Sequence, residues 1–111
     1  MGTVTFAFLD PGWNVRLARR MSKHNIRHFM DNGGLLHFSS SDEDIVEREI
    51  INPLRSEIFG SWKILCCPQD WVHRYQSYMD QNGIPYIVEL SDGEIEFLIP
   101  GKHNPHRWKD L

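Results

Sequence analysis

Cys67 and His37 are the residues whose types and positions are best suited to chemistry. Cys67 ends an apolar run and precedes Pro68, where a helix is expected to begin. The positive end of a helix dipole stabilises a thiolate. His37 lies in a predicted strand that we expect near Glu94 or Glu96, and a histidine oriented by a carboxylate can act as a general acid or base. Cys67 and His37 are therefore the candidate catalytic residues.

The segment around Cys67 resembles part of a known family. Lys63 to Glu89 contains Cys67-Pro68 and, further on, Gly83-Ile84-Pro85-Tyr86, and in these features it is similar to the first β-α-β unit of glutaredoxins. The resemblance implies a redox role for Cys67. Asp70 stands where a dithiol motif has its second cysteine. The alternative interpretation is a small half-buried cysteine at the end of a strand.

The sequence lacks the common motifs of cofactor binding and catalysis. It has no phosphate-binding loop, dinucleotide fingerprint, zinc-protease helix or nucleophile elbow. His103 and His106 have ligand-like spacing, but Asp110 is the only carboxylate nearby, and zinc sites show tighter pairs of ligands. We therefore expect no cofactor and no metal, and the sequence favours a function other than catalysis.

Positive charge gathers on one predicted helix. Arg16, Arg19, Arg20 and Lys23 share one helix face, and Arg27 follows them. This face is either a solvated surface or a contact for phosphates or an acidic protein. The whole chain has a formal charge of −3, which gives no general attraction to nucleic acid.

Hydrophobic alternation, turns and caps predict an α+β fold in a single domain, residues 1–111. Two β-α-β-β units, residues 3–38 and 61–99, are joined by a helical linker at 39–60 and followed by a polar tail at 100–111. The tail is expected to be either mobile or a strap. Pro53 is expected to divide the linker into two short helices, with Asn52 as the cap of the second.

The two units match in sequence at an offset of 58, as an internal repeat would. The matched pairs are Trp13 with Trp71, Leu17 with Tyr75, Met21 with Met79, Asn25 with Gly83, and Phe6 with Ile64. Each unit is expected to place its helix on the same face of one mixed sheet. The first 66 residues also have the ferredoxin-like order of elements.

The other face of that sheet is predicted to be uncovered and to carry a mixture of apolar and charged side chains. Its expected residues are Thr5, Ala7, Arg27, Phe29, Leu35, His37, Leu65, Cys67, Ile87, Glu89, Glu94, Glu96 and Leu98. A patch of this kind is typical of an interface, so we expect a homodimer or a complex with a partner protein. The alternative is that the linker helices cover this face.

The sequence therefore predicts a small protein-binding module of the inhibitor, immunity or phage-type anti-defence class, acting by stoichiometric contact. Its expected contact residues are Arg16, Arg19, Arg20, Lys23, Arg27, Phe29, Leu35, Ile87 and Trp108. The alternatives are nucleic-acid binding through the basic helix, and a small enzyme or ligand-binding regulator that uses Cys67 or His37.

The cysteines are evidence about the cellular compartment in which the protein is expected to lie. Cys66 and Cys67 are neighbours, and neighbours do not form an ordinary disulfide without strain. No apolar run is long enough for a membrane helix, and the first ten residues are typical of a strand rather than a signal peptide. We expect a cytoplasmic protein with no membrane contact.

Overall fold

An antiparallel sheet of six strands organises residues 2–111, which are the residues that the computed structural model describes. The strands are β1 (Thr3–Phe8), β2 (His28–Met30), β3 (Leu36–Ser39), β4 (Trp62–Cys67), β5 (Ile87–Ser91) and β6 (Glu94–Pro100). The helices are α1 (Pro11–Lys23), α2 (Glu43–Val46), α3 (Asn52–Phe59) and α4 (Val72–Gln81). The α+β class is confirmed. The expected mixed sheet is wrong, because every neighbouring pair of strands is antiparallel.

The strands follow the order β2-β3-β1-β5-β6-β4, so each half of the chain forms one half of the sheet. The halves meet where β1 pairs with β5, with Phe6 opposite Ser91 and Phe8 opposite Glu89. A ferredoxin-like order would place β4 beside β1. Here β5 occupies that position and β4 lies at the far edge, so the ferredoxin-like order is not confirmed.

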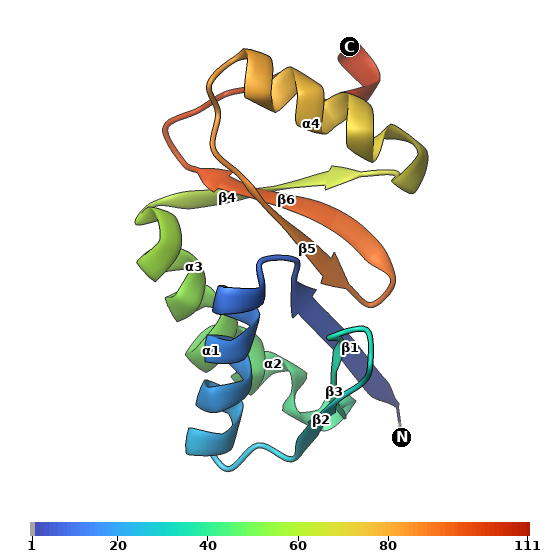
Figure 1. Cartoon of the computed structure of the whole chain (residues 1–111). Helices are drawn as coiled ribbons and strands as arrows, with labels where there is room; N and C mark the ends of the chain where they lie inside the picture. The colour runs from blue at the N-terminus through green and yellow to red at the C-terminus, as the bar shows by residue number, and fades with distance from the viewer. Residues whose placement is uncertain (1) are drawn as a thin grey trace.

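The register between β1 and β5 places helices on both faces of the sheet. Residues directly opposite each other share a face, so Phe8 and Glu89 point to one side and Val88 points to the other. The linker face, with Val4, Phe6, Phe8, Glu89 and Glu96, is covered by α1, α2 and α3 (Figure 1). The α4 face, with Leu65, Cys67, Val88 and Phe97, is covered by α4. The expectation of helices on one face is therefore wrong.

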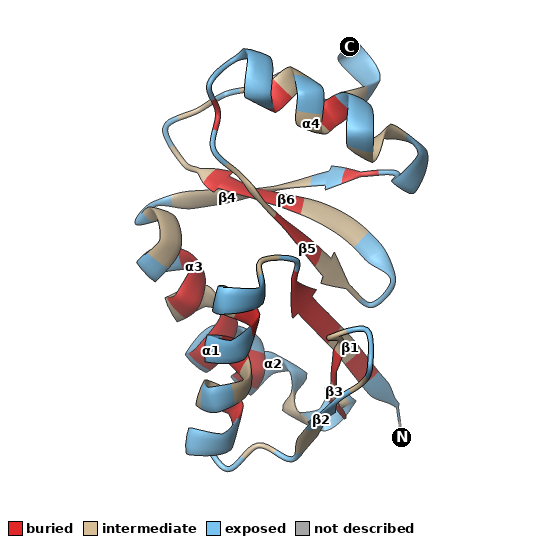
Figure 2. Cartoon of the chain, in the orientation of Figure 1, coloured by how far each residue is buried: buried red, intermediate tan, exposed pale blue. Residues whose placement is uncertain are grey.

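Two hydrophobic cores result, one on each face (Figure 2). Leu17, Met21 and Leu54 are buried in the first core, and Tyr75 and Met79 in the second, as the helix stripes predict. In β4, however, Leu65 and not Ile64 lies opposite Phe97 and faces α4. The offset of 58 between Phe6 and Ile64 thus fails in this strand, and the internal repeat is not confirmed.

Local signals set the ends of α1 as expected. The Asp10 carboxylate accepts a hydrogen bond from the Trp13 amide at 3.1 Å, and Pro11 occupies the first helical turn. After the helix, Asn25 has a φ of 57°, the left-handed conformation that asparagine tolerates well.

Pro53 does not divide the linker in two. The helical path continues from α2 through a π-helical turn (Glu47–Ile51) into α3. A proline has no N–H and its ring presses on the preceding turn, and the wider π turn accommodates both effects. Asn52 is helical, with φ −62° and ψ −41°, so its expected role as a cap is wrong.

Asn14 connects three elements of the first half. Its side chain accepts a hydrogen bond from the Phe8 amide at 3.0 Å and donates one to the Gly34 carbonyl at 2.7 Å. We predict that Asn14→Ala lowers the free energy of unfolding by about 2 kcal/mol, because it leaves these two main-chain groups without a partner. Urea denaturation measures the change. The exposed Ser77→Ala variant on α4 is the control and should stay close to wild type.

Candidate functional site

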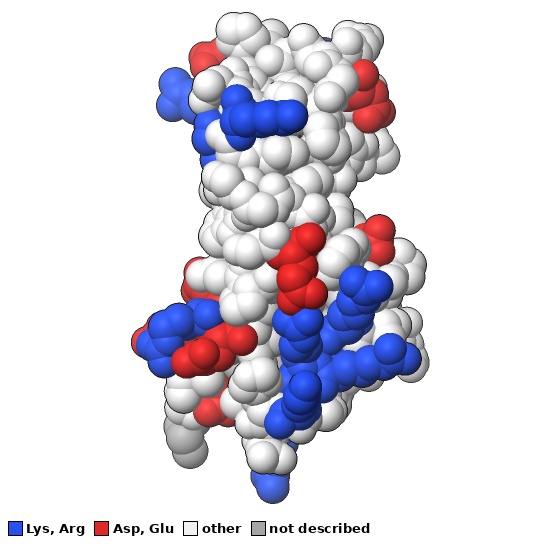
Figure 3. All heavy atoms as spheres, turned by 90° about the vertical axis from the view of Figure 1, so that its left-hand side faces the viewer, with Lys and Arg blue, Asp and Glu red and all other residues white. Residues whose placement is uncertain are grey.

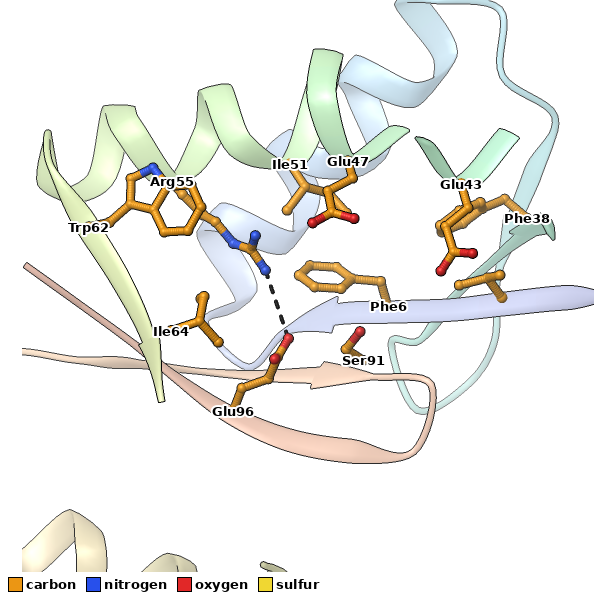
Figure 4. Close-up of a pocket in the computed structure, with 11 residues that line it drawn as sticks. Phe6, Phe38, Glu43, Glu47, Ile51, Arg55, Trp62, Ile64, Ser91 and Glu96 are labelled. Carbon is orange, nitrogen blue, oxygen red and sulfur yellow. Dashed lines mark ion pairs between the residues drawn. The ribbon is translucent and has the colours of Figure 1, made fainter. Parts of the chain in front are cut away.

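A pocket of about 300 Å³ lies between the linker helices and the linker face of the sheet. Figure 4 shows its side chains, which come from both halves of the chain. The lining residues are Val4, Phe6, Phe38, Glu43, Glu47, Ile51, Arg55, Trp62, Ile64, Ser91 and Glu96. Apolar and aromatic walls thus enclose three carboxyl groups and one guanidinium.

Arg55 is held in place by a buried ion pair with Glu89. The Arg55 Nε and Nη2 atoms donate to the two Glu89 carboxylate oxygens at 3.0 and 2.5 Å, and both side chains are almost completely buried. A third donor, Nη1, reaches the Asn52 side-chain oxygen at 2.9 Å. The guanidinium carbon lies 5.0 Å from the centre of the Trp62 ring. Arg55 therefore uses its Nε, Nη1 and Nη2 donors for bonds within the protein.

Glu96 lies beside this pair and has a strongly raised pKa. One of its oxygens is 3.8 Å from Arg55 Nη2, and Glu96 lies directly opposite Glu89 in the register between β5 and β6. Burial raises the pKa of Glu96 to about 7, and the negative charge of Glu89 adds to the rise. Burial also raises the pKa of Glu89, against the opposing effect of Arg55. Because Glu89 accepts two hydrogen bonds from Arg55, which favour its charged form, Glu96 is the carboxyl better placed to take up a proton.

Glu43 and Glu47 complete the pocket from the side of the helices. Both residues are exposed, and their carboxylates extend into the pocket from α2 and the π-helical turn (Figure 4). Within residues 2–111, no group of three or more histidine, cysteine, aspartate and glutamate residues is placed to hold a metal ion. Carboxylates beside Phe6, Phe38 and Trp62 suit an organic cation, because aromatic faces also attract positive charge.

Cys67 is buried and differs from a reactive thiolate. Its Sγ donates a hydrogen bond to the Pro68 carbonyl at 3.4 Å, and burial raises the pKa of the thiol. A 3-10 turn, Gln69–Trp71, separates it from α4, so the first turn of that helix does not begin at Pro68. The pKa of Cys67 thus shifts in the opposite direction from the one that nucleophilic or redox chemistry requires.

His37 lies on the opposite face of the sheet from Glu96. It is opposite Thr5 in the register between β1 and β3, whereas Glu96 shares the linker face with Glu89. The expected pairing with Glu94 or Glu96 is therefore wrong. Its partner is Asp31, at 2.8 Å, and this hydrogen bond is the main cause of the lowered pKa of Asp31. The ring of Phe29 stacks on His37 with 4.5 Å between ring centres.

The expected basic contact residues share a surface only in part. Figure 3 shows Lys and Arg side chains gathered on one region of the lower half, where α1 carries Arg16, Arg19, Arg20 and Lys23. Arg20 forms an ion pair with Glu57 of α3 at 2.6 Å, and Arg16 lies over the ring of Trp13. Arg27 is exposed in the segment that leads into β2.

The other expected contact residues lie apart. Phe29 is 60% exposed and Leu35 is half-buried, but Ile87 packs against the first core on the linker face. The ring of Trp108 packs against that of Trp71 in a tilted arrangement, with 5.5 Å between ring centres. In the second half the linker helices cover Ile87, Glu89, Glu96 and Leu98, as the alternative interpretation held, whereas Leu65 and Cys67 face α4. The predicted common surface through Phe29 and Ile87 is therefore wrong.

Comparison with known proteins gives no family. No protein-family model matches the chain, and no curated protein or solved structure matches it. Within residues 2–111, no helix has the length and apolar character needed to cross a membrane.

Sequence reasoning did not single out Arg55, Glu47 or Glu43, and it placed Glu89 and Glu96 on an open face. One signal was available for Glu89. Glu89 lies between Val88 and Leu90 in a strongly apolar strand that is expected to be buried. A buried acidic residue needs a cation as its partner.

We predict that Arg55→Met lowers the free energy of unfolding by about 3–5 kcal/mol, because Glu89 then stays buried without its cation. Adding Glu89→Leu should recover most of this loss, since an apolar pair replaces the ion pair. Urea denaturation measures both. A double variant that is no more stable than Arg55→Met alone would contradict the assignment.

Glu96 makes the stability depend on pH. The ordinary pKa of a glutamate is 4.5 and that of folded Glu96 is about 7, so the folded protein binds the extra proton between these values. Stability should therefore fall as pH rises from about 5 to about 8. Glu96→Gln cannot ionise, so it should match wild type near pH 5 and exceed it near pH 8, by about 1–3 kcal/mol. Urea denaturation at both pH values tests this, with the exposed Glu94→Gln as the matched control.

Proposed function

We propose that the chain is a non-enzymatic protein-binding module that acts by stoichiometric contact, as small inhibitors, immunity proteins and phage-type anti-defence proteins do. We further propose that its pocket receives a basic side chain of the partner. One observation carries this proposal: the pocket holds Glu43, Glu47 and Glu96, while Arg55, the one cation that lines it among residues 2–111, is already bound to Glu89.

The dimensions and walls of the pocket favour a single side chain over a larger ligand. A volume of about 300 Å³ is at the lower end of ligand pockets. Arginine and lysine have apolar stems that can pack on Phe6, Phe38 and Trp62, and charged ends that can reach the carboxylates. The three carboxyl groups of the pocket are also a source of specificity, since they disfavour acidic side chains.

The basic face of α1 supports a second candidate function, the binding of phosphates. Arg16, Arg19 and Lys23 gather on one surface (Figure 3), although Arg20 is paired with Glu57. Affinity for nucleic acid through this face would fall steeply with salt concentration, whereas binding of a single cation in the pocket would change much less.

We predict that N-acetyl-arginine methylamide binds in the pocket and that Glu43→Gln with Glu47→Gln weakens this binding about tenfold. Titration followed by NMR measures the affinity and shows which amides respond. The matched control is Asp44→Asn with Glu49→Gln, which also removes two negative charges, at exposed residues of the same linker that lie outside the pocket lining. Equal loss in the control would show that only the overall charge matters.

We also propose that the protein is cytoplasmic and that its two halves are an internal repeat. Both cysteines, Cys66 and Cys67, are free, which is typical of a reducing compartment. The strand orders β2-β3-β1 and β5-β6-β4 are alike, which supports a common β-α-β-β unit.

A further inference from the structure

Strand β4 is an open edge of the sheet. All six of its residues pair with β6, and β4 is the last strand in the order. Among the described residues, no hydrogen bond other than those to β6 reaches the main chain of Trp62–Cys67. Alternate N–H and C=O groups of an edge strand point away from the sheet and are free to pair with another strand. The opposite edge, β2, has only three residues.

The side chains of β4 do little to protect this edge. The strand contains no proline, and its only charged residue is Lys63. The Lys63 ammonium is already bound to the His103 carbonyl at 2.7 Å and to the Asn104 side chain at 2.6 Å. Lys63 shares the α4 face with Leu65, so its charge is held away from the linker face. An edge with these properties favours the addition of an extended segment.

The register connects this edge to the pocket. Trp62 and Ile64 of β4 line the pocket, and Cys66 lies directly opposite Glu96 on the same face. A strand added to β4 would lie about 4.8 Å from it, and so about 9.6 Å from β6. Cys66 is small and exposed. A long side chain on the added strand can therefore extend over Cys66 toward the Glu96 carboxyl.

We propose that the partner presents its basic residue on an extended segment that adds to β4 as a seventh strand. Main-chain hydrogen bonds to β4 supply most of the affinity, and the lysine or arginine beside Cys66 supplies the specificity by reaching Glu96. This inference rests on the proposed function, because it identifies the class of partner that the pocket receives.

A second copy of the chain does not fit as this partner. Two β4 strands paired about a two-fold axis perpendicular to the sheet keep their linker faces on the same side. The β4 residues on that face are Trp62, Ile64 and Cys66, and none of them is basic. Such a dimer would leave the carboxylates without a cation, so the occupant is the segment of another protein.

Two probes test the inference, N-acetyl-arginine methylamide and a capped seven-residue peptide with one central arginine among alternating threonines and valines. We expect the peptide to bind at least about tenfold more tightly than the single amino acid and to slow amide exchange in β4. Every second amide of the bound peptide faces β4, and the others face away from it. N-methylation of the amides that face β4 should remove this gain in affinity, whereas N-methylation of the amides that face away should not. Replacing its arginine with glutamine should also weaken binding about tenfold.

A pair of variants at one position provides the control. Cys66→Phe places a large side chain between the added strand and Glu96, so the arginine peptide should lose its advantage over the glutamine peptide. Cys66→Ser keeps the path open and should behave as wild type. Neither variant should change the binding of N-acetyl-arginine methylamide.

The outcomes separate the two proposals. If the single amino acid binds but the peptide binds no better, or leaves amide exchange in β4 unchanged, strand addition is wrong and the proposed function stands. If the peptide protects β4 equally well with arginine or glutamine, the connection between edge and pocket is wrong. If neither probe binds, the proposed function fails, and the inference fails with it.

Discussion

The buried ion pair between Arg55 and Glu89 is the interaction on which the arrangement of this protein depends. Glu89 lies in the middle of the sheet with no exposed surface, and a carboxylate there without a cation would cost several kcal/mol. Helix α3 must therefore lie over this half of the sheet, where it contacts β4 and β6, to bring Arg55 to Glu89. Once α3 is there, the linker covers the second half of the sheet on the side opposite α4, and the floor of the pocket is formed.

The same pair determines the chemistry of the pocket. Arg55 can satisfy one carboxylate completely, and it gives its bonds to Glu89 and Asn52. Glu96 is left close to a cation that is already neutralised, so it either keeps a proton or meets a positive charge from outside. Among the described side chains that line the pocket, no second cation balances Glu43, Glu47 and Glu96.

The features that were predicted correctly from the sequence are those that depend on residues close to one another in the chain. Asp10, Pro11 and Asn25 set the ends of α1, because capping and left-handed backbone are local effects. The relation between the two halves depends on register, and a slip of one residue turns every side chain of a strand to the other face. Neither alternation nor caps specify that Phe8 pairs with Glu89 rather than Val88. The pocket was missed for the same reason, since Arg55 and Glu89 are 34 positions apart.

The junction between β1 and β5 has a consequence for how the chain folds. The hairpins β2–β3 and β5–β6 join neighbouring segments, whereas β1 pairs on one side with residues near position 90. Long loops close late because their ordering costs entropy before any contact forms. During synthesis, the inner edge of β1 therefore stays open until most of the chain has left the ribosome. In that interval the apolar segment Phe6-Ala7-Phe8 has an unpaired edge that is open to wrong pairing with other chains.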